Sequence, residues 1–479
     1  MVNSKQHSGK PSVRQRAEAV AAEPLKIRAS TPYDFKGRNL TAYGGLFPVG
    51  TMLEKLGFRQ LVEENLTIKR RTRVMPAYEF VLAMVLAFYI GFSRLNHLQF
   101  LKSEPMLTGI LKVQNLPPQS TFWRFLASLQ LSAAGQILRI QQALRQRVWE
   151  AANIQLKEVT IDTDTTVHTL FGHQMGGRKS FNPKNPGKKS YQPILTFLAE
   201  TREYISGGLH NGDRHTGAQI TRHLKGVFAA LPLGIETIKA RADAGFYCAA
   251  AVQTYERAGV QFIIVAHKAG RLLDALKAAE WKKSRDPEAD GECDLLYQPK
   301  AWSKAYRHIA LRYKQAPKSD KQLPLIDTLE YRYRVFITNM EGPVTELAEF
   351  YDGRAGAENL IKESNNDAGL AAYPSARWDM NCNHFQLAMM AYNLNCWLIV
   401  FNREEEAKVK TLHHTMLSTT RLKSVFVAAR IHCHAGLVGI SYSDHYAEKG
   451  LFQRLMERLR AVARSGSRLA PVIPIALRC

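Results

Sequence analysis

The sequence has no apolar run long enough to cross a membrane, which argues against a spanning helix. Its longest apolar stretch, FVLAMVLAFYIGF at 80–92, has the length of a buried helix. The first residues, MVNSKQHSGKPSVRQRAEAV, include basic side chains but not the apolar segment of a secretory signal. We therefore expect no membrane association and a location in a cytoplasm.

Paired cysteines are also missing. None of the six cysteines lies in a CxxC pair, so reduced thiols are expected and a structural zinc site is disfavoured. The segments NCNH at 381–384 and IHCH at 431–434 keep zinc open as an alternative. Repeats and low-complexity tracts are absent, and 46% hydrophobic with 22% charged residues is typical of a globular protein.

Acidic residues are scarce relative to basic ones. The chain has 42 Asp and Glu against 65 Lys and Arg, a net charge of +23 and a pI near 9.7. A surplus of this size indicates a polyanionic partner, with DNA or RNA as the default. A basic membrane-surface protein is the weaker alternative, because we find neither a long amphipathic basic helix nor a lipidation motif.

The chain is too long, at 479 residues, for one compact core. In the N-terminal part, LPPQSTFWRFLASL is compatible with a helix-turn-helix, so this part or the basic tail could recognise DNA. Changes of character along the chain predict five regions: a helical N-terminal DNA-binding domain (1–155), a first part of an α/β core (156–268), a β-rich insertion (269–330), a second part of the core with a Glu-bearing helix (331–405), and a basic helical C-terminal region (406–479).

Alternating and β-branched segments predict the strands of the α/β core. KEVTIDTDTTVHTLF, QPILTFLAETR and EYISGGLHNG have the pattern of three successive strands. Two helix–strand units follow, TGAQITRHLKGVFAAL with ETIKARADAGFY and CAAAVQTYERAG with VQFIIVAH. The order βββαβαβ is that of the RNase H-like fold, in which three antiparallel strands are extended in parallel by crossovers.

Carboxylates occur where strands of this core are expected to meet. Asp162 and Asp164 alternate on the first strand and point to the same face, while Asp243 lies near the end of the fourth. The first and fourth strands are neighbours in this order, which brings Asp164 and Asp243 together. Glu358, on a later helix, can close over the same edge. Such a cluster predicts a site for two divalent ions, Mg²⁺ or Mn²⁺, acting on a phosphodiester.

The segment YDGRAGAENLIKESNND at 351–367 predicts a helix with one functional stripe. The residues of the stripe follow at spacings of three, four and four, and they are Tyr351, Arg354, Glu358 and Lys362. A solvated face with a Glu–Lys pair is the ordinary interpretation of such spacing. Beside a metal site, we expect Arg354 and Lys362 to hold phosphates and Tyr351 to donate a hydrogen bond.

A basic loop follows the first strand of the core. No acid occurs between Asp164 and Glu200, so the positive charge of the loop is not offset within the segment. A solvated surface is the ordinary interpretation, but beside a phosphodiester site we expect contacts to the DNA backbone. The cations of the loop are Arg178, Lys179, Lys184, Lys188 and Lys189.

Together these motifs resemble a known family. IDTDTT…FGHQMGGRKSFNPKNPGKKSYQP, then RADAGF, then YDGRAGAENLIKE are similar to the DDE transposases of bacterial insertion sequences. The sequence is most similar to the IS1380-type, within the larger group that carries a Tyr-Arg-Glu signature. The resemblance extends over roughly 157–395, with a looser match at PPQSTFWRFL.

The resemblance implies a role for each matching residue. Asp164, Asp243 and Glu358 correspond to the catalytic triad, and Asp162 remains a rival for the first acid. The signature has a further Lys seven residues after the Glu, but Asn365 stands there in this sequence. This difference removes the basis for one expected phosphate contact and leaves the expected metal site unchanged. The residues that match the signature helix are Tyr351, Arg354 and Lys362.

The resemblance also implies a reaction and its partners. Such enzymes act in the bacterial cytoplasm at the nucleoid, and they bind the terminal inverted repeats of their own element, typically as dimers. Metal-activated water nicks the element end, and the freed 3′-hydroxyl attacks DNA, in cut-and-paste members by way of a hairpin and then the target. A nuclease that cleaves without joining, or an inactive DNA-binding regulator, is the alternative function.

An aromatic residue of the insertion is the last candidate. In related enzymes the insertion supplies an aromatic that stabilises a flipped base. Trp302 in PKAWSKAYRH is the candidate here, and Trp281 is the alternative. Because tryptophan is highly buried on average, a packing role is the ordinary interpretation of both.

Overall fold

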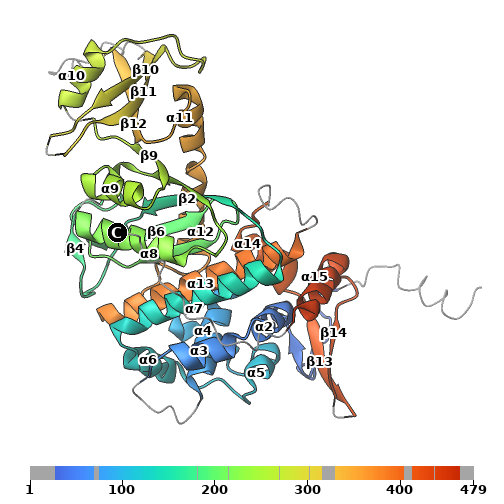
Figure 1. Cartoon of the computed structure of the whole chain (residues 1–479). Helices are drawn as coiled ribbons and strands as arrows, with labels where there is room; N and C mark the ends of the chain where they lie inside the picture. The colour runs from blue at the N-terminus through green and yellow to red at the C-terminus, as the bar shows by residue number, and fades with distance from the viewer. Residues whose placement is uncertain are drawn as a thin grey trace, which may run out of the picture.

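In the part of the chain that the structure describes, a mixed sheet of eight strands lies between helices (Figure 1). The computed structural model describes residues 27–68, 75–180, 182–213, 215–268, 270–300, 302–314, 330–403, 413–435 and 437–463. The strand order is β10-β11-β12-β9-β8-β2-β6-β7. The strands are β2 (Glu158–Thr165), β6 (Ile194–Leu198), β7 (Tyr204–Gly208), β8 (Thr237–Ala242), β9 (Gln261–Val265), β10 (Gly291–Tyr297), β11 (Tyr306–Lys314) and β12 (Tyr331–Thr338).

The strand order and directions predicted for the core are confirmed. β2, β6 and β7 are antiparallel neighbours, and β8 and β9 extend the sheet in parallel from β2. The crossover helices are α8 (Gly217–Ala230) and α9 (Ala249–Arg257). A capping box begins α8, because the Thr216 hydroxyl accepts from the Gln219 backbone N–H while the Gln219 side chain accepts from the Thr216 N–H.

The segment predicted as a β-rich insertion continues the central sheet. β10 and β11 pair antiparallel, β11 pairs with β12, and β12 returns antiparallel to β9. Alternate residues of these strands pack against two different helices. Ala310 and Val335 join the cluster under α10 (Gly270–Ala278), whereas Ile309 and Phe336 face α11 (Val344–Asp352). The upper part of Figure 1 shows this extension.

A long buried helix, α13 (Trp378–Asn402), lies beneath the sheet (Figure 1). It is surrounded by protein on all sides, which explains why its apolar residues show no single face. α7 (Leu131–Ala151) runs along it, and α4 (Ala77–Tyr89) packs on it as the buried helix predicted for the longest apolar run. The other N-terminal elements are α2 (Leu46–Lys55), α3 (Phe58–Asn65), η1 (Leu95–Leu101), α5 (Pro105–Leu111) and α6 (Gln119–Ser128). None of the described helices is long and apolar enough to span a bilayer.

The C-terminal region contains a hairpin as well as helices. β13 (Ala429–His434) and β14 (Leu437–Tyr442) pair antiparallel, and the short β1 (Leu40–Thr41) adds to β13. The region predicted as helical therefore also contains this hairpin, which the sequence prediction did not include. The helical elements are α14 (Leu417–Thr420), the π-helical turn η4 (Arg421–Val425) and α15 (Lys449–Ala461).

A buried ion pair fastens the helices to the sheet. The side chains of Arg145 on α7 and Glu203 before β7 are fully buried, with Nε and Oε1 3.2 Å apart. Glu203 also accepts hydrogen bonds from the indole N–H groups of Trp397 (2.7 Å) and Trp149 (3.0 Å) and from the Thr201 hydroxyl (2.6 Å). Buried charges are tolerated when they are paired and hydrogen-bonded, so this cluster fixes α7 and α13 against β7.

We expect Glu203→Gln to destabilise the protein strongly, by about 3–5 kcal/mol, because it leaves the buried Arg145 without its counter-charge. The measurement is the midpoint of urea unfolding followed by tryptophan fluorescence. The matched control is Glu236→Gln, whose carboxylate is 65% exposed and pairs with Lys157 at the surface; its effect should stay below about 1 kcal/mol. Equal midpoints for the two variants would contradict the proposed anchoring role.

Candidate active site at the ends of β2 and β8

Two aspartates lie side by side where β2 and β8 end. These parallel strands pair Thr163 with Ala242, so Asp164 and Asp243 follow at the same level of the sheet. Neighbouring strands are about 4.8 Å apart, which places the two carboxylates together. Asp243 is fixed further as the N-cap of the turn η2 (Ala244–Phe246), where its Oδ1 accepts from the Gly245 N–H at 3.0 Å. The adjacency predicted for this pair is confirmed.

Burial and mutual repulsion govern the charge of this pair. Burial, and then the negative charge of Asp164, raise the pKa of Asp243 to about 7. Burial also raises the pKa of Asp164, opposed by the positive charge of Arg354. Two adjacent buried carboxylates resist simultaneous ionisation, so the pair favours either a proton or a cation.

Arg354 joins the third acid to this pair. Its Nη1 donates to Asp164 Oδ2 at 2.8 Å, and its Nη2 donates to Glu358 Oε1 at 3.0 Å. The Glu358 side chain is 63% exposed, whereas that of Arg354 is mostly buried. Among the described residues, no three Asp, Glu, His or Cys side chains lie close enough to share a metal ion. Asp164 and Asp243 are therefore adjacent, and Glu358 is connected to them through a guanidinium.

The predicted single helix with one stripe is wrong. The structure has α11 and α12 (Ala355–Asn366), separated by a turn at Gly353 and Arg354. Tyr351 ends up buried in α11, its ring 4.8 Å from that of Phe336, while Lys362 is exposed on α12. The four residues therefore do not share the surface of one continuous helix.

A buried arginine explains the interruption. Arg241 on β8 donates from Nη1 to the carbonyl of Phe350 at 2.8 Å, which is the acceptor that Arg354 N–H would use in an unbroken helix. The Arg354 N–H bonds to the Tyr351 carbonyl instead. A Cβ on Gly353 would lie only 2.2 Å from Arg241 Nη1, so a residue without a side chain is needed there. A side chain that enters the helical hydrogen-bond ladder is a known cause of such breaks.

The same arginine engages Asp162, the rival for the first acid. Arg241 Nε donates to Asp162 Oδ1 at 2.6 Å, and Nη2 donates to Oδ2 at 2.8 Å. Both carboxylate oxygens are thus held in a buried bidentate pair. Of the two aspartates on β2, Asp164 is the one that accepts a hydrogen bond from Arg354 and interacts with Asp243.

A second tie between α12 and the strand region was missed from the sequence. Asn365 on α12 bonds through Oδ1 to His168 Nε2 at 2.8 Å, and His168 Nδ1 contacts the Tyr373 hydroxyl. Burial lowers the pKa of His168 to about 4, so the imidazole is neutral. His168 lies four residues after Asp164, and Asn365 seven after Glu358. This network therefore fixes the helix of the third acid relative to the strand of the first.

The cations of the basic loop lie on a small sheet that follows β2 in the chain and in the connection between two of its strands. It is formed by β3 (His168–Thr169), β5 (Lys189–Tyr191) and β4 (Arg178–Lys179). All five predicted cations are exposed, and they are Arg178, Lys179, Lys184, Lys188 and Lys189. Arg178 lies 3.7 Å from the carboxylate of Asp213, which is itself exposed.

Both candidate tryptophans of the insertion pack against other rings. The Trp302 ring lies 5.3 Å from that of Tyr247 and 5.5 Å from that of Tyr306. Trp281 donates its indole N–H to the Leu276 carbonyl and lies under the Arg312 guanidinium at 4.8 Å. Each is half-buried.

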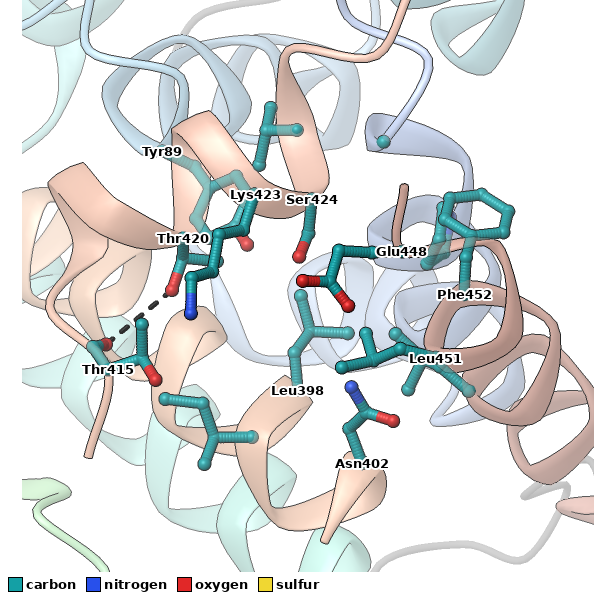
Figure 2. Close-up of a pocket in the computed structure, with 15 residues that line it drawn as sticks. Tyr89, Leu398, Asn402, Thr415, Thr420, Lys423, Ser424, Glu448, Leu451 and Phe452 are labelled. Carbon is teal, nitrogen blue, oxygen red and sulfur yellow. Dashed lines mark hydrogen bonds between the residues drawn. The ribbon is translucent and has the colours of Figure 1, made fainter. Parts of the chain in front are cut away.

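Two other features lie apart from the acids. A cavity of about 140 Å³, lined mostly by apolar residues such as Leu398, Leu451 and Phe452, lies between α13 and α15 (Figure 2). The five described cysteines are free thiols, and the NCNH and IHCH segments contribute to no metal-binding cluster among the described residues. None of the candidate acids lines this cavity.

The chain is similar to known transposases in sequence and in structure. A family model described as "Transposase DDE domain group 1" matches residues 24–464. The cryo-EM structure of a piggyBac transposase synaptic complex with hairpin DNA is similar, at 10% identity over 90% of this chain and 86% of that chain, with a TM-score of 0.42. The Mos1 transposase paired-end complex with the left transposon end gives 11% identity, 55% and 70% coverage, and a TM-score of 0.16. No curated protein matches.

The raised pKa of Asp243 predicts a defined pH dependence in metal-free buffer. An unfolded Asp titrates near 3.9, so between about pH 4 and pH 7 the native state keeps a proton that the unfolded state has lost. In this window Asp243 ionises in the unfolded state but stays protonated in the native state, so stability falls as the pH rises. Above about pH 7 Asp243 is ionised in both states, and stability falls no further on its account. Asp243→Asn should raise the melting temperature more at pH 8 than at pH 5, by on the order of a few degrees.

Differential scanning fluorimetry with EDTA measures this difference directly. Glu236→Gln is the control, since its carboxylate lies at the opposite end of β8 and is exposed. A variant-minus-wild-type difference that is the same at both pH values would show that Asp243 does not have the raised pKa.

Proposed function

This chain belongs to the family of transposases described as Transposase DDE domain group 1, and on that premise we propose that it serves a bacterial insertion sequence of the IS1380-type. It binds the terminal inverted repeats of its element as a homodimer, cleaves at the element ends, and joins the freed ends to target DNA by cut-and-paste. The observation that carries this proposal is the pair of Asp164 and Asp243 on adjacent strand ends, with Glu358 linked to them through Arg354.

The sheet topology supports placing this pair in an RNase H-like core. Three antiparallel strands are followed by two parallel crossovers, so the ends of β2 and β8 meet at one edge. α12 follows the strands of the insertion and returns to β2. This order places Asp164 and Asp243 together at the carboxyl ends of β2 and β8, and it brings α12, which carries Glu358, beside them.

The donor chemistry of the three acids suits hard divalent cations, although Glu358 reaches the aspartate pair only through Arg354 in this structure. All their donor atoms are carboxylate oxygens, which Mg²⁺ and Mn²⁺ prefer. Burial, and then repulsion by Asp164, raise the pKa of Asp243, and a bound cation would offset both effects. Asp164, Asp243 and Glu358 would hold two such ions. When bound, the ions activate a water or a 3′-hydroxyl and stabilise the leaving oxygen of the phosphodiester.

The residues around the acids hold and orient DNA. Arg354 already contacts Asp164 and Glu358, so its guanidinium is placed to receive a phosphate beside the acids. Lys362 is exposed one turn after Glu358 on α12 and offers a second cation. Tyr351 is buried, with the Arg354 guanidinium 5.6 Å above its ring, so it orients this arginine. The cations of the small sheet contact the backbone further along the duplex.

Cleavage of a labelled duplex that carries the element's own end tests this function. With Mg²⁺ or Mn²⁺ we expect nicking at the end by wild type, and a loss of about 10²-fold or more in Asp164→Asn, Asp243→Asn and Glu358→Gln. The size follows because metal ligation supplies several kcal/mol of transition-state stabilisation. Glu236→Gln, at the far end of β8, should cleave like wild type.

The products separate the transposase from its alternatives. Joining of the freed 3′-end to a second DNA molecule is required for a transposase, whereas cleavage without joined product identifies a nuclease on the same core. Specific binding to the end without cleavage under either metal would identify a DNA-binding regulator instead. Equal cleavage by the three acid variants and wild type would overturn the assigned site.

A further inference from the structure

Phe171 exposes its apolar ring seven residues after Asp164 in the chain. The residue is 80% exposed and lies in the turn that follows β3. A single exposed hydrophobic residue is ordinary on a protein surface. Three further observations, on the rigidity of the turn, its charge and its position, distinguish this one.

The turn that presents Phe171 is fixed at both ends. The Leu170 N–H donates to the Lys189 carbonyl, and the Met175 N–H donates to the Ala376 carbonyl, both at 2.8 Å. The Tyr191 hydroxyl donates to the Met175 carbonyl at 2.6 Å. These bonds attach the turn to β5 and to the segment before α13, so the ring is held in solvent by a fixed backbone.

A glycine completes this attachment. Gly176 has φ +82°, in the left-handed region that glycine adopts readily. A Cβ there would lie 2.6 Å from the Trp378 ring, so the turn approaches the start of α13 more closely than a side chain permits. The position of the turn is therefore determined by packing as well as by hydrogen bonds.

The surroundings of Phe171 are strongly positive. Arg178, Lys179 and Lys189 lie on β4 and β5 of the small sheet, and Lys184 and Lys188 lie in the connection between them. No acid occurs from 165 to 199, and Asp213 beside Arg178 offsets one of these charges. An exposed aromatic within a cationic surface is the combination that binds unpaired nucleic acid, since the ring stacks on a base while the cations hold the phosphates. A protein partner would need acidic groups to match these charges.

The chain length between Asp164 and Phe171 limits how far apart the two residues can lie. Phe171 lies seven residues after Asp164, and an extended chain spans at most about 3.3 Å per residue, so the two are within roughly 23 Å. DNA advances about 3.4 Å per nucleotide, so one strand spans this limit within about seven nucleotides. Trp302, by contrast, already packs against Tyr247 and Tyr306.

We propose that Phe171 is a stacking platform for an unpaired base of the DNA strand that passes Asp164 and Asp243, with the cations of the small sheet holding the adjoining phosphates. The inference rests on the proposed function for its substrate. Its ligand is a single-stranded or frayed DNA segment, because paired bases present only their edges to a side chain. A stacked base is worth about 1–3 kcal/mol, or roughly 5- to 150-fold in affinity.

The test uses metal-free binding, so that it does not depend on cleavage. The probes are a 20-nucleotide oligo(dT) strand containing one 2-aminopurine and a blunt duplex of the same length, measured by anisotropy and by 2-aminopurine quenching. Phe171→Ala should weaken single-strand binding at least about 5-fold and relieve the quenching, with duplex affinity unchanged within about twofold. Phe171→Trp should restore both signals, because tryptophan also stacks.

Two control variants separate stacking from charge and from general surface effects. Leu233→Ala removes a residue that is 77% exposed before β8, at the end of the sheet away from Asp243, and it should bind both probes like wild type. Lys188→Gln should weaken both probes and flatten the salt dependence, because it removes a phosphate contact. Unchanged melting temperatures are expected for all variants, since each side chain is exposed.

The outcomes also separate this inference from the proposed function. Equal loss on both probes, loss on the duplex alone, or no loss in Phe171→Ala would overturn the stacking role. A wild-type protein that joins DNA while Phe171→Ala binds single strands normally would refute the platform alone. Selective single-strand binding through Phe171 in a protein that never cleaves its element end would support the platform and refute the transposase.

Discussion

The geometry of the candidate site depends on one buried ion pair, between Asp162 on β2 and Arg241 on β8. The Asp162 carboxylate fixes the Arg241 guanidinium, which donates a hydrogen bond to the Phe350 carbonyl of α11. This carbonyl is then not available to the helical hydrogen bond from the Arg354 N–H. The helix must then end at Gly353, and the chain restarts with Arg354 directed at the acids. Asp162, both of whose carboxylate oxygens bond to Arg241, thereby determines where Arg354 and Glu358 lie.

The parts of this arrangement that sequence could predict are those with a local signal. Strand order followed from alternation and from the helical segments between strands, and the adjacency of Asp164 and Asp243 followed from that order. The break at Gly353 could not be found in the same way, because it depends on a side chain more than a hundred positions earlier. The sign that was available was Arg241 itself, since an arginine on a buried strand requires a partner.

Charge balance connects the acids to their basic neighbours. Asp164 and Asp243 cannot both ionise cheaply in their buried position, and Arg354 supplies the nearest positive charge. The same guanidinium bonds to Glu358, so it satisfies the acids from both sides. Any cation or phosphate that enters must compete with these bonds or use them. The site is thus pre-arranged electrostatically, with its third acid held at the surface.

Burial and charge also explain why Asn365 stands where the signature has a lysine. His168 is buried and neutral, and it already contacts the Tyr373 hydroxyl on its other nitrogen. A lysine at position 365 would bring a positive charge to the buried, neutral His168, at a cost in desolvation. An amide offers a neutral hydrogen bond instead. The side chain at this position thus fixes the distance between α12, which carries Glu358, and β3, the strand after β2.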